Sequence, residues 1–238
     1  MSTIAIIIAG GTGARTHQDI PKQFVSVNNK PIIVYTMEAF QNHPSVDSIC
    51  VVILKGWEEI LRAYAKQFNI TKLRWVVVGG ATGQESIFNG LKAVHDECED
   101  MDVVMIHDAV RPMISQDVIT DNLVKQRLYG SAVVTIPCTE VVFISENMED
   151  SVKTIPRETL QRTQTPQSYY LKDLWEAHME AKRRGIKNAV ASCSLMETLG
   201  HKTYFSKGSE KNIKITTAED IEIFKALLFA KNDEWIKK

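Results

Sequence analysis

Three glycines and two cationic side chains lie close together near the start of the chain, namely Gly10, Gly11, Gly13, Arg15 and Lys22. Glycines let the backbone approach a ligand closely and point its N–H groups at an anion. They follow a wholly apolar run at residues 4–9, which predicts a buried strand of a parallel sheet. A strand, a glycine-rich loop and nearby positive charges together predict a site that holds a polyphosphate.

The residues of this loop exclude two common phosphate-binding motifs. The loop lacks the Gly-Lys-Ser/Thr ending of a P-loop, which argues against an ATPase or GTPase of that type. A dinucleotide-binding fingerprint would need a glycine at the position of Thr16. The alternative without a function is a glycine turn after the first strand, followed by an ordinary surface arginine and lysine.

Two further segments follow predicted strands. Residues 79–86 are rich in glycine, and residues 107–112 place Asp108 and Arg111 at a strand end. Because ligands of open α/β sheets bind beyond the carboxyl ends of the strands, we expect both segments to meet the first loop there. Asp108 could hold a ribose hydroxyl or a Mg²⁺ ion; it could instead cap a helix or pair with Arg111. His107 is expected to be structural, since no nucleophile pattern accompanies it.

The alternation of apolar runs and helical patterns defines the fold class. Strands are predicted at residues 4–9, 48–54, 73–78, 103–106 and 131–136, and helices at 32–40, 57–68, 86–97 and 115–129. This order predicts an α/β protein with a mostly parallel sheet and helices on both faces. Ser86 is placed to cap its helix, and a capping-box pattern at residues 216–220 opens a C-terminal helix.

Residues 138–164 interrupt this alternation. Polar and apolar residues alternate there, which predicts a β-arm projecting from the sheet. Because a lone hairpin is only marginally stable in water, we expect the arm to pack against a second copy of the chain. No linker or repeat divides the 238 residues, so one domain spanning 1–238 is predicted.

Composition excludes several classes of function. Lys and Arg number 28 against 29 Asp and Glu, so no charge imbalance points to nucleic acid or to an anionic membrane. The four cysteines are scattered and predict neither a disulfide framework nor a zinc site. No segment approaches the roughly 20 apolar residues of a membrane span, and the N-terminal segment lacks the pattern of a signal peptide. We therefore expect a soluble, cytoplasmic protein.

Six segments in order along residues 4–228 carry a resemblance: Ala9-Gly-Gly-Thr-Gly-Ala-Arg15, Pro21-Lys-Gln23, Gly79-Gly80 with Ser86, His107-Asp-Ala-Val-Arg-Pro112, Thr165-Pro-Gln167 and Asn212-Ile-Lys-Ile-Thr-Thr217. They resemble the cytidylyltransferase family that includes 2-C-methyl-D-erythritol 4-phosphate cytidylyltransferase and ribitol-5-phosphate cytidylyltransferase. Residues 79–82, 84–91 and 214–217 are more similar to the ribitol-phosphate branch.

The resemblance implies a single-domain, Rossmann-like nucleotidyltransferase and its reaction. CTP and an alditol phosphate, D-ribitol 5-phosphate first, would give a CDP-alditol and pyrophosphate in the presence of Mg²⁺. The acceptor phosphate would attack the α-phosphorus of CTP in line, with no protein nucleophile. Catalysis would then depend on positioning and on neutralising charge in the transition state. The product would be a precursor of a cell-surface polysaccharide or teichoic acid.

The resemblance also implies the site residues. The catalytic residues are Arg15 and Lys22, which stabilise the transition state, and Arg157 and Lys214, which position the acceptor phosphate. The nucleotide-binding residues are Ala9, Gly10, Gly11, Thr12, Gly13, Gly80, Ala81, Thr82, Ser86 and Asp108, and Asp108 is also the candidate metal ligand. The acceptor-binding residues are Arg111, Glu140, Arg157, Thr165 and Lys214. In the family the arm embraces a second subunit, so we expect a homodimer in which Arg157 serves the other chain's Lys22.

The chain departs from the family pattern at four places. Gly83 replaces an arginine, Thr16 a Met or Phe, Glu140-Val141 an Asp-Thr pair, and Ala191-Ser192 an acidic pair. Two alternatives therefore stay open, the methylerythritol-phosphate enzyme of isoprenoid synthesis and a non-catalytic nucleotide-binding protein. All four predicted catalytic residues, Arg15, Lys22, Arg157 and Lys214, are present, which argues against a non-catalytic protein.

Overall fold

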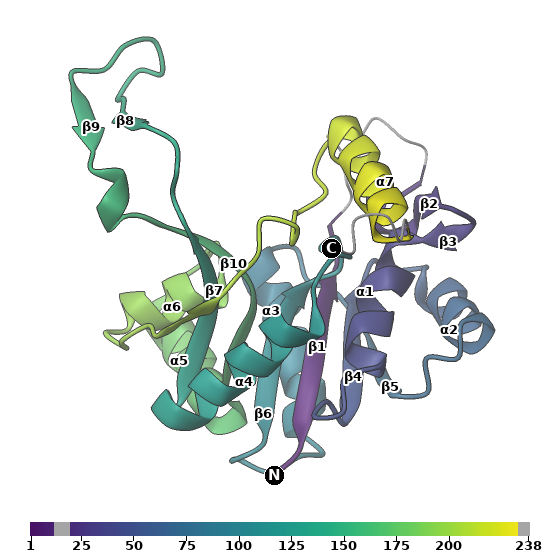
Figure 1. Cartoon of the computed structure of the whole chain (residues 1–238). Coiled ribbons are helices and arrows are strands. Elements are labelled where there is room, and N and C mark those ends of the chain that lie inside the picture. Colours follow the sequence, from purple (N-terminus) through teal and green to yellow (C-terminus); the bar gives the residue numbers. More distant parts are fainter. Residues whose placement is uncertain (12–19, 233–238) are drawn as a thin grey trace.

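The structure is a computed structural model that describes residues 1–11 and 20–232, and its centre is a seven-stranded sheet (Figure 1). The strands follow the order β11-β7-β10-β6-β1-β4-β5. β10 runs antiparallel to both of its neighbours, whereas the other neighbouring pairs are parallel. The strands are β1 (Thr3–Ala9), β4 (Ser48–Ile53), β5 (Leu73–Val78), β6 (Val103–Asp108), β7 (Ser131–Pro137), β10 (Gln161–Tyr170) and β11 (Phe205–Lys207).

Helices cover both faces of the sheet. One face packs against α1 (Ile32–Gln41), α2 (Glu58–Gln67) and α4 (Gln116–Tyr129), and the other against α3 (Gly83–His95), α5 (Leu171–Arg184) and α6 (Ser192–Thr198). Successive side chains of β1 alternate between the two cores, with Ala5 and Ile7 in the first and Ile4 and Ile6 in the second. This burial on both faces explains the continuous apolar run at residues 4–9.

The predicted α/β order is confirmed, with element ends differing by a few residues. Two corrections concern local structure. Thr82, not Ser86, is the N-cap of α3, because the Thr82 side chain accepts a hydrogen bond from the Glu85 N–H and Ser86 lies inside the helix. The structure also contains four elements that were not predicted, namely β10, β11, α5 and α6. Of these, β10 is the antiparallel strand in the otherwise parallel sheet.

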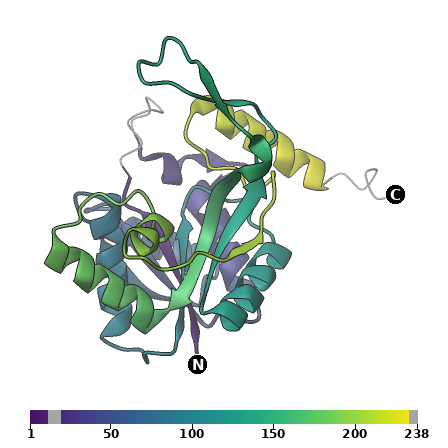
Figure 2. The same ribbon diagram turned by 90° about the vertical axis from the view of Figure 1, so that its left-hand side faces the viewer.

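The predicted β-arm is confirmed as a hairpin that projects from the body of the molecule (Figures 1 and 2). It contains β8 (Val142–Ile144), β9 (Lys153–Ile155) and the short 3-10 helix η3 (Arg157–Thr159). Apolar side chains on it lie open, with Phe143 63% and Val152 104% exposed. Covering such apolar side chains with a second surface removes them from water, which is energetically favourable.

Smaller elements complete the fold around the upper edge of the sheet in Figure 1: η2 (Lys22–Phe24), β2 (Ser26–Val27), β3 (Lys30–Pro31) and α7 (Ala218–Asn232). The predicted capping box is confirmed, since the Asp220 carboxylate accepts from the Thr217 N–H at 2.8 Å and the Thr217 hydroxyl accepts from the Asp220 N–H at 3.3 Å. α7 then packs Ile221 and Phe224 into a third apolar cluster. Among the described residues, no helix is long and apolar enough to cross a membrane.

Candidate active site

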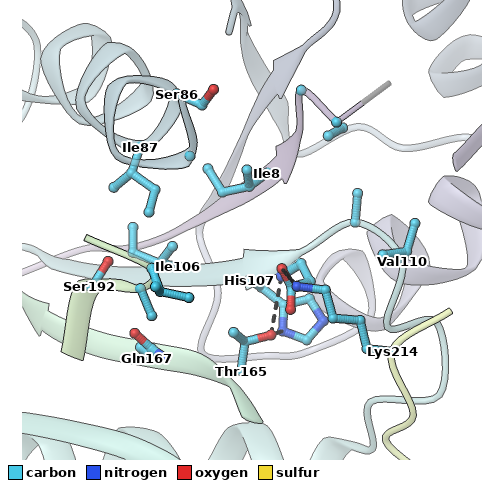
Figure 3. A pocket seen from close by; sticks show the side chains of 18 of the residues that line it. Ile8, Ser86, Ile87, Ile106, His107, Val110, Thr165, Gln167, Ser192 and Lys214 are labelled. Carbon is cyan, nitrogen blue, oxygen red and sulfur yellow. Dashed lines mark hydrogen bonds and ion pairs between the residues drawn. The ribbon is translucent and has the colours of Figure 1, made fainter. Parts of the chain in front are cut away.

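A cavity of about 650 Å³ lies beyond the carboxyl ends of β1 and β6, and the predicted segments meet there. Figure 3 shows Ser86, Ile87 and Ser192 on one side of it and Thr165, His107 and Lys214 on the other. The predicted site residues that line it are Ala9, Gly10, Gly11, Lys22, Gly80, Ala81, Thr82, Ser86, Asp108, Arg111, Thr165 and Lys214. Residues more than a hundred positions apart therefore converge at one sheet edge.

The loop between β5 and α3 is held by the first turn of that helix. The Ser86 hydroxyl donates to the Thr82 carbonyl at 2.9 Å and accepts from the Gly80 N–H at 3.1 Å. The Ala81 N–H donates to a Glu85 carboxylate oxygen at 2.8 Å. The N–H groups of Gly80 and Ala81 are thus engaged, whereas their carbonyl oxygens accept no hydrogen bond from any described residue.

Three glycines of the two loops lie where an added Cβ would crowd a neighbour. A Cβ on Gly10 would lie 3.2 Å from the Ser86 Oγ, and one on Gly79 would lie 3.1 Å from it. At Gly80 the clash is harder, since a Cβ would lie 2.3 Å from the Glu85 Cβ. Ser86 therefore packs both glycine loops against each other and fixes the floor of the cavity at this end.

Lys22 enters the cavity from the short helix η2, which is tied to the first loop by its neighbour. The Gln23 amide donates to the Ala9 carbonyl at 2.7 Å and to the Gly11 carbonyl at 3.2 Å. Gln23 is 2% exposed, so this anchor is protected from water. Thr12, Gly13, Arg15 and Thr16 lie outside the described residues, so their predicted roles stay predictions.

Two cations share the carboxylate of Asp108. One Asp108 oxygen lies 3.0 Å from the Lys214 Nζ, and the other lies 2.9 Å from the Arg111 Nε. Arg111 also donates to the Asn212 carbonyl at 2.8 Å. Burial alone would raise the pKa of Asp108, but Lys214 and Arg111 outweigh it and lower that pKa below its ordinary value. The ionised cluster carries a net charge of +1, which suits a phosphate. Of the alternatives for Asp108, pairing with Arg111 is confirmed.

His107 supports this cluster from behind. It is fully buried, and burial lowers its pKa to about 4, so the ring is neutral near pH 7. The Thr165 Oγ lies 3.0 Å from the His107 Nδ1 and accepts from the Asp108 N–H at 3.1 Å. The His107 Nε2 lies 3.3 Å from the Arg111 carbonyl, which can only accept. Nε2 therefore carries the ring proton, and Nδ1 accepts from the Thr165 hydroxyl. Both ring nitrogens are used, as a structural role requires.

The structure does not bring Glu140 and Arg157 to the cavity of their own chain. Arg157 lies on η3, where it donates to the Thr139 carbonyl at 3.2 Å, and its side chain is 55% exposed. Glu140 is exposed at the base of the arm, where its own backbone and the charge of Arg162 lower its pKa. Their predicted contacts with the acceptor stay predictions.

Two residues on the far wall of the cavity, Gln167 and Ser192, were not predicted as site residues. Gln167 on β10 accepts from the Cys193 N–H at 2.9 Å, which fixes the segment that precedes and opens α6. Ser192 also lines the cavity, is 2% exposed, and its Oγ has no hydrogen-bond partner among the described residues. In the sequence, Gln167 belongs to one of the family motifs and Ser192 stands where the family has an acidic residue. Neither pattern indicates which wall of the cavity the residue lines.

This geometry fits the comparisons with known proteins. Residues 3–230 match the family described as IspD: 2-C-methyl-D-erythritol 4-phosphate cytidylyltransferase. The ribitol-5-phosphate cytidylyltransferase of Lacticaseibacillus paracasei is 43% identical, covering 94% of this chain and 97% of the relative. The 2-C-methyl-D-erythritol 4-phosphate cytidylyltransferase of Clostridium botulinum is 36% identical, covering 94% and 96%. Among solved structures, 4-diphosphocytidyl-2C-methyl-D-erythritol synthase from Anaerococcus prevotii has a TM-score of 0.82 at 26% identity, covering 96% of each chain.

Proposed function

The chain belongs to the IspD family of cytidylyltransferases, and from that premise we propose that it transfers the cytidylyl group of CTP to D-ribitol 5-phosphate. One observation carries the choice of acceptor. Relatives named ribitol-5-phosphate cytidylyltransferase are 38–43% identical, whereas those named for methylerythritol phosphate are 36–37% identical, at similar coverage. The product, CDP-ribitol, would serve a cell-surface polysaccharide, and the use of CTP fits a cytoplasmic enzyme.

The glycine-loop end of the cavity suits the base of CTP. Cytosine presents an amino donor beside ring acceptors, and the open carbonyl oxygens of Gly80 and Ala81 can accept from that amino group. The Ser86 hydroxyl is already engaged with the loop, so its main contribution is to hold these carbonyls in place. Gly80 packs directly against Glu85 of α3, and we expect the pocket that it helps to form to exclude purines.

The cationic end of the cavity suits the reacting phosphates. A phosphate oxygen of the acceptor attacks the α-phosphorus of CTP, and the bond from that phosphorus to the bridging oxygen of pyrophosphate breaks. Lys214 and Arg111, held 3.0 Å and 2.9 Å from Asp108, would bind the acceptor phosphate and reduce its repulsion from the triphosphate. Lys22, at the first loop, would neutralise charge that grows on the triphosphate oxygens.

Asp108 is the one carboxylate among the described residues that line the cavity. No group of three or more His, Cys, Asp or Glu side chains that could hold a metal ion occurs in the described part of the chain. Mg²⁺ is commonly held by one or two carboxylates together with substrate phosphates, so this donor set fits an ion that enters with CTP. Bound beside Asp108, the ion would neutralise triphosphate charge.

A homodimer would bring Arg157, on the arm, to the active site of the partner subunit. Arg157 lies outside its own cavity, and the arm exposes apolar side chains such as Phe143. We therefore propose that Arg157 binds the acceptor phosphate beside the other chain's Lys22. Arg157→Ala and Lys22→Ala homodimers should each be nearly inactive, and their co-refolded mixture should regain part of the activity. A mixture with proven heterodimers that stays inactive would rule out this arrangement.

The acceptor is tested by pyrophosphate release with CTP and a panel of phosphorylated alditols. We expect kcat/KM for D-ribitol 5-phosphate to exceed that for 2-C-methyl-D-erythritol 4-phosphate by at least tenfold. The second acceptor is the alternative because the family match and the solved structures bear its name. An equal or reversed preference would overturn the proposed acceptor and leave the cytidylyl transfer standing.

A further inference from the structure

A second cavity, of about 470 Å³, adjoins the first, and Thr82 lines both of them. α3 contributes Gln84, Glu85 and Phe88 to its lining, and α5 contributes His178 and Lys182. The loop after α5 completes it. Its volume lies within the range of about 300–1,000 Å³ that is typical of small-molecule sites.

The lining combines an apolar wall with an unsatisfied polar atom. The Phe88 ring stacks on Trp175 at a centroid distance of 5.5 Å and lies 5.8 Å from the His178 ring. His178 is only 4% exposed, and its Nε2 has no hydrogen-bond partner among the described residues. Burial lowers its pKa to about 4, so the ring is neutral near pH 7 and is suited to a polar ligand atom without a charge. A buried polar atom without a partner costs stability unless something occupies it.

The rim of this cavity carries charge of mainly one sign. Lys182 and Lys187 are exposed at the rim, and Glu85 is the acidic residue of the lining. The Glu85 carboxylate is turned to the loop, where one of its oxygens accepts from the Ala81 N–H at 2.8 Å. The two lysines therefore favour an acidic group on a bound molecule.

The two cavities share groups that shape their walls. Thr82 lines both of them, and it caps α3 by accepting from the Glu85 N–H at 3.1 Å. Gln84 forms a second link, since its amide donates to the Ile186 carbonyl at 3.0 Å and accepts from the Ala189 N–H at 2.9 Å. The segment that it holds continues directly into Val190, which lines the first cavity. A molecule that contacts Gln84 and Thr82 therefore acts on groups that shape both cavities.

We propose that the second cavity binds a small molecule with an apolar ring and one acidic group, and that this molecule changes the affinity of the first cavity for the nucleotide. The ring would pack on Phe88, a polar ring atom would meet His178, and the acidic group would pair with Lys182 and Lys187. The coupling rests on the proposed use of CTP; the binding does not. By linkage, CTP must change the affinity for this molecule by the same factor.

The probe is 8-anilinonaphthalene-1-sulfonate, which has apolar rings and one sulfonate and fluoresces when bound in an apolar site. We expect saturable binding of one probe per folded chain. The double variant Lys182→Gln and Lys187→Gln should weaken binding at least fivefold, and His178→Phe should weaken it while keeping the ring stack. Lys125→Gln, on the distant helix α4, is the matched control and should leave binding unchanged.

The coupling is measured by titrating the probe with and without saturating CTP. We expect a change of at least threefold in its dissociation constant, mirrored in the affinity for CTP when the probe is saturating. Gln84→Met, which removes both amide hydrogen bonds, should reduce that factor toward one. Probe binding that is absent, or equal in the cavity variants and the control, overturns the site. Binding without any effect on CTP affinity overturns the regulation, and it does so whether or not ribitol phosphate is the acceptor.

Discussion

Gly80→Ala is the substitution whose effect follows most directly from the geometry. The added Cβ would lie 2.3 Å from the Glu85 Cβ and 3.1 Å from the Glu85 carbonyl carbon. Carbon atoms in contact are about 3.5–4.0 Å apart, so the loop has to move by about 1.2–1.7 Å. The Glu85 Cβ is fixed to the first turn of α3 and cannot swing away as a side-chain end could. The loop itself must therefore shift.

That shift is expected at the wall that binds the nucleotide. A displacement of about 1 Å in a positioned group can cost about 10²-fold in rate, so we expect kcat/KM for CTP to fall by about that factor. Pyrophosphate release at varied CTP measures the loss, and thermal unfolding shows whether the fold survives the strain of about 1–3 kcal/mol.

Gly83→Ala is the matched control on the same loop. A Cβ at Gly83 meets no atom within 4 Å, and the residue opens α3 without a positive φ. Although Gly83 lines the cavity, the added methyl group meets no atom, so we expect kcat/KM within about twofold of the parent. If Gly80→Ala behaved like Gly83→Ala in a folded protein, the loop would not be the nucleotide wall and the reasoning would be refuted.

The remaining predictions concern charge. In steady-state kinetics, Lys22→Gln should lower kcat by about 10²–10³ while KM for CTP changes far less. A change confined to KM would show that Lys22 binds the ground state and the transition state equally well. Replacing Glu140-Val141 by Asp-Thr should shift the order of kcat/KM across the acceptor panel with CTP affinity unchanged; an unaltered order would place this pair outside the acceptor site. Because the pKa of Asp108 is lowered in the folded protein, its carboxylate stabilises the fold above its ordinary pKa of 3.8 and loses this effect as pH falls through the lowered value. The difference in unfolding free energy between the parent and Asp108→Asn should therefore shrink below about pH 4, and a constant difference would contradict the assigned ion pairs.

Local patterns predicted the parts of the fold that depend on neighbouring residues. The run at residues 4–9 predicted β1 because burial on both faces leaves no polar position in such a strand. The glycine loops and the motif at residues 107–112 predicted one edge of the sheet, because parallel strands end there together. The convergence of Asp108 with Lys214 followed from resemblance alone, since 106 positions separate them.

Long-range packing decided the features that sequence reasoning missed. β10 begins with exposed polar residues at 161–163 and becomes a strand through pairing with β7 and β6 on its two sides. Thr82 rather than Ser86 caps α3, because the helix begins earlier than its apolar pattern, at Gly83. The placement of Ser192 beside the nucleotide cavity depends on Gln167, a contact that no local spacing reveals.

The most direct measurement of the central claim is ³¹P NMR of the folded chain with CTP, Mg²⁺ and D-ribitol 5-phosphate. We predict that the CTP signals are replaced by those of pyrophosphate and of a diphosphate diester, with one diester formed for each pyrophosphate, and only when the acceptor is present. Pyrophosphate release without an acceptor, or CMP in place of the diester, would contradict transfer to the polyol phosphate.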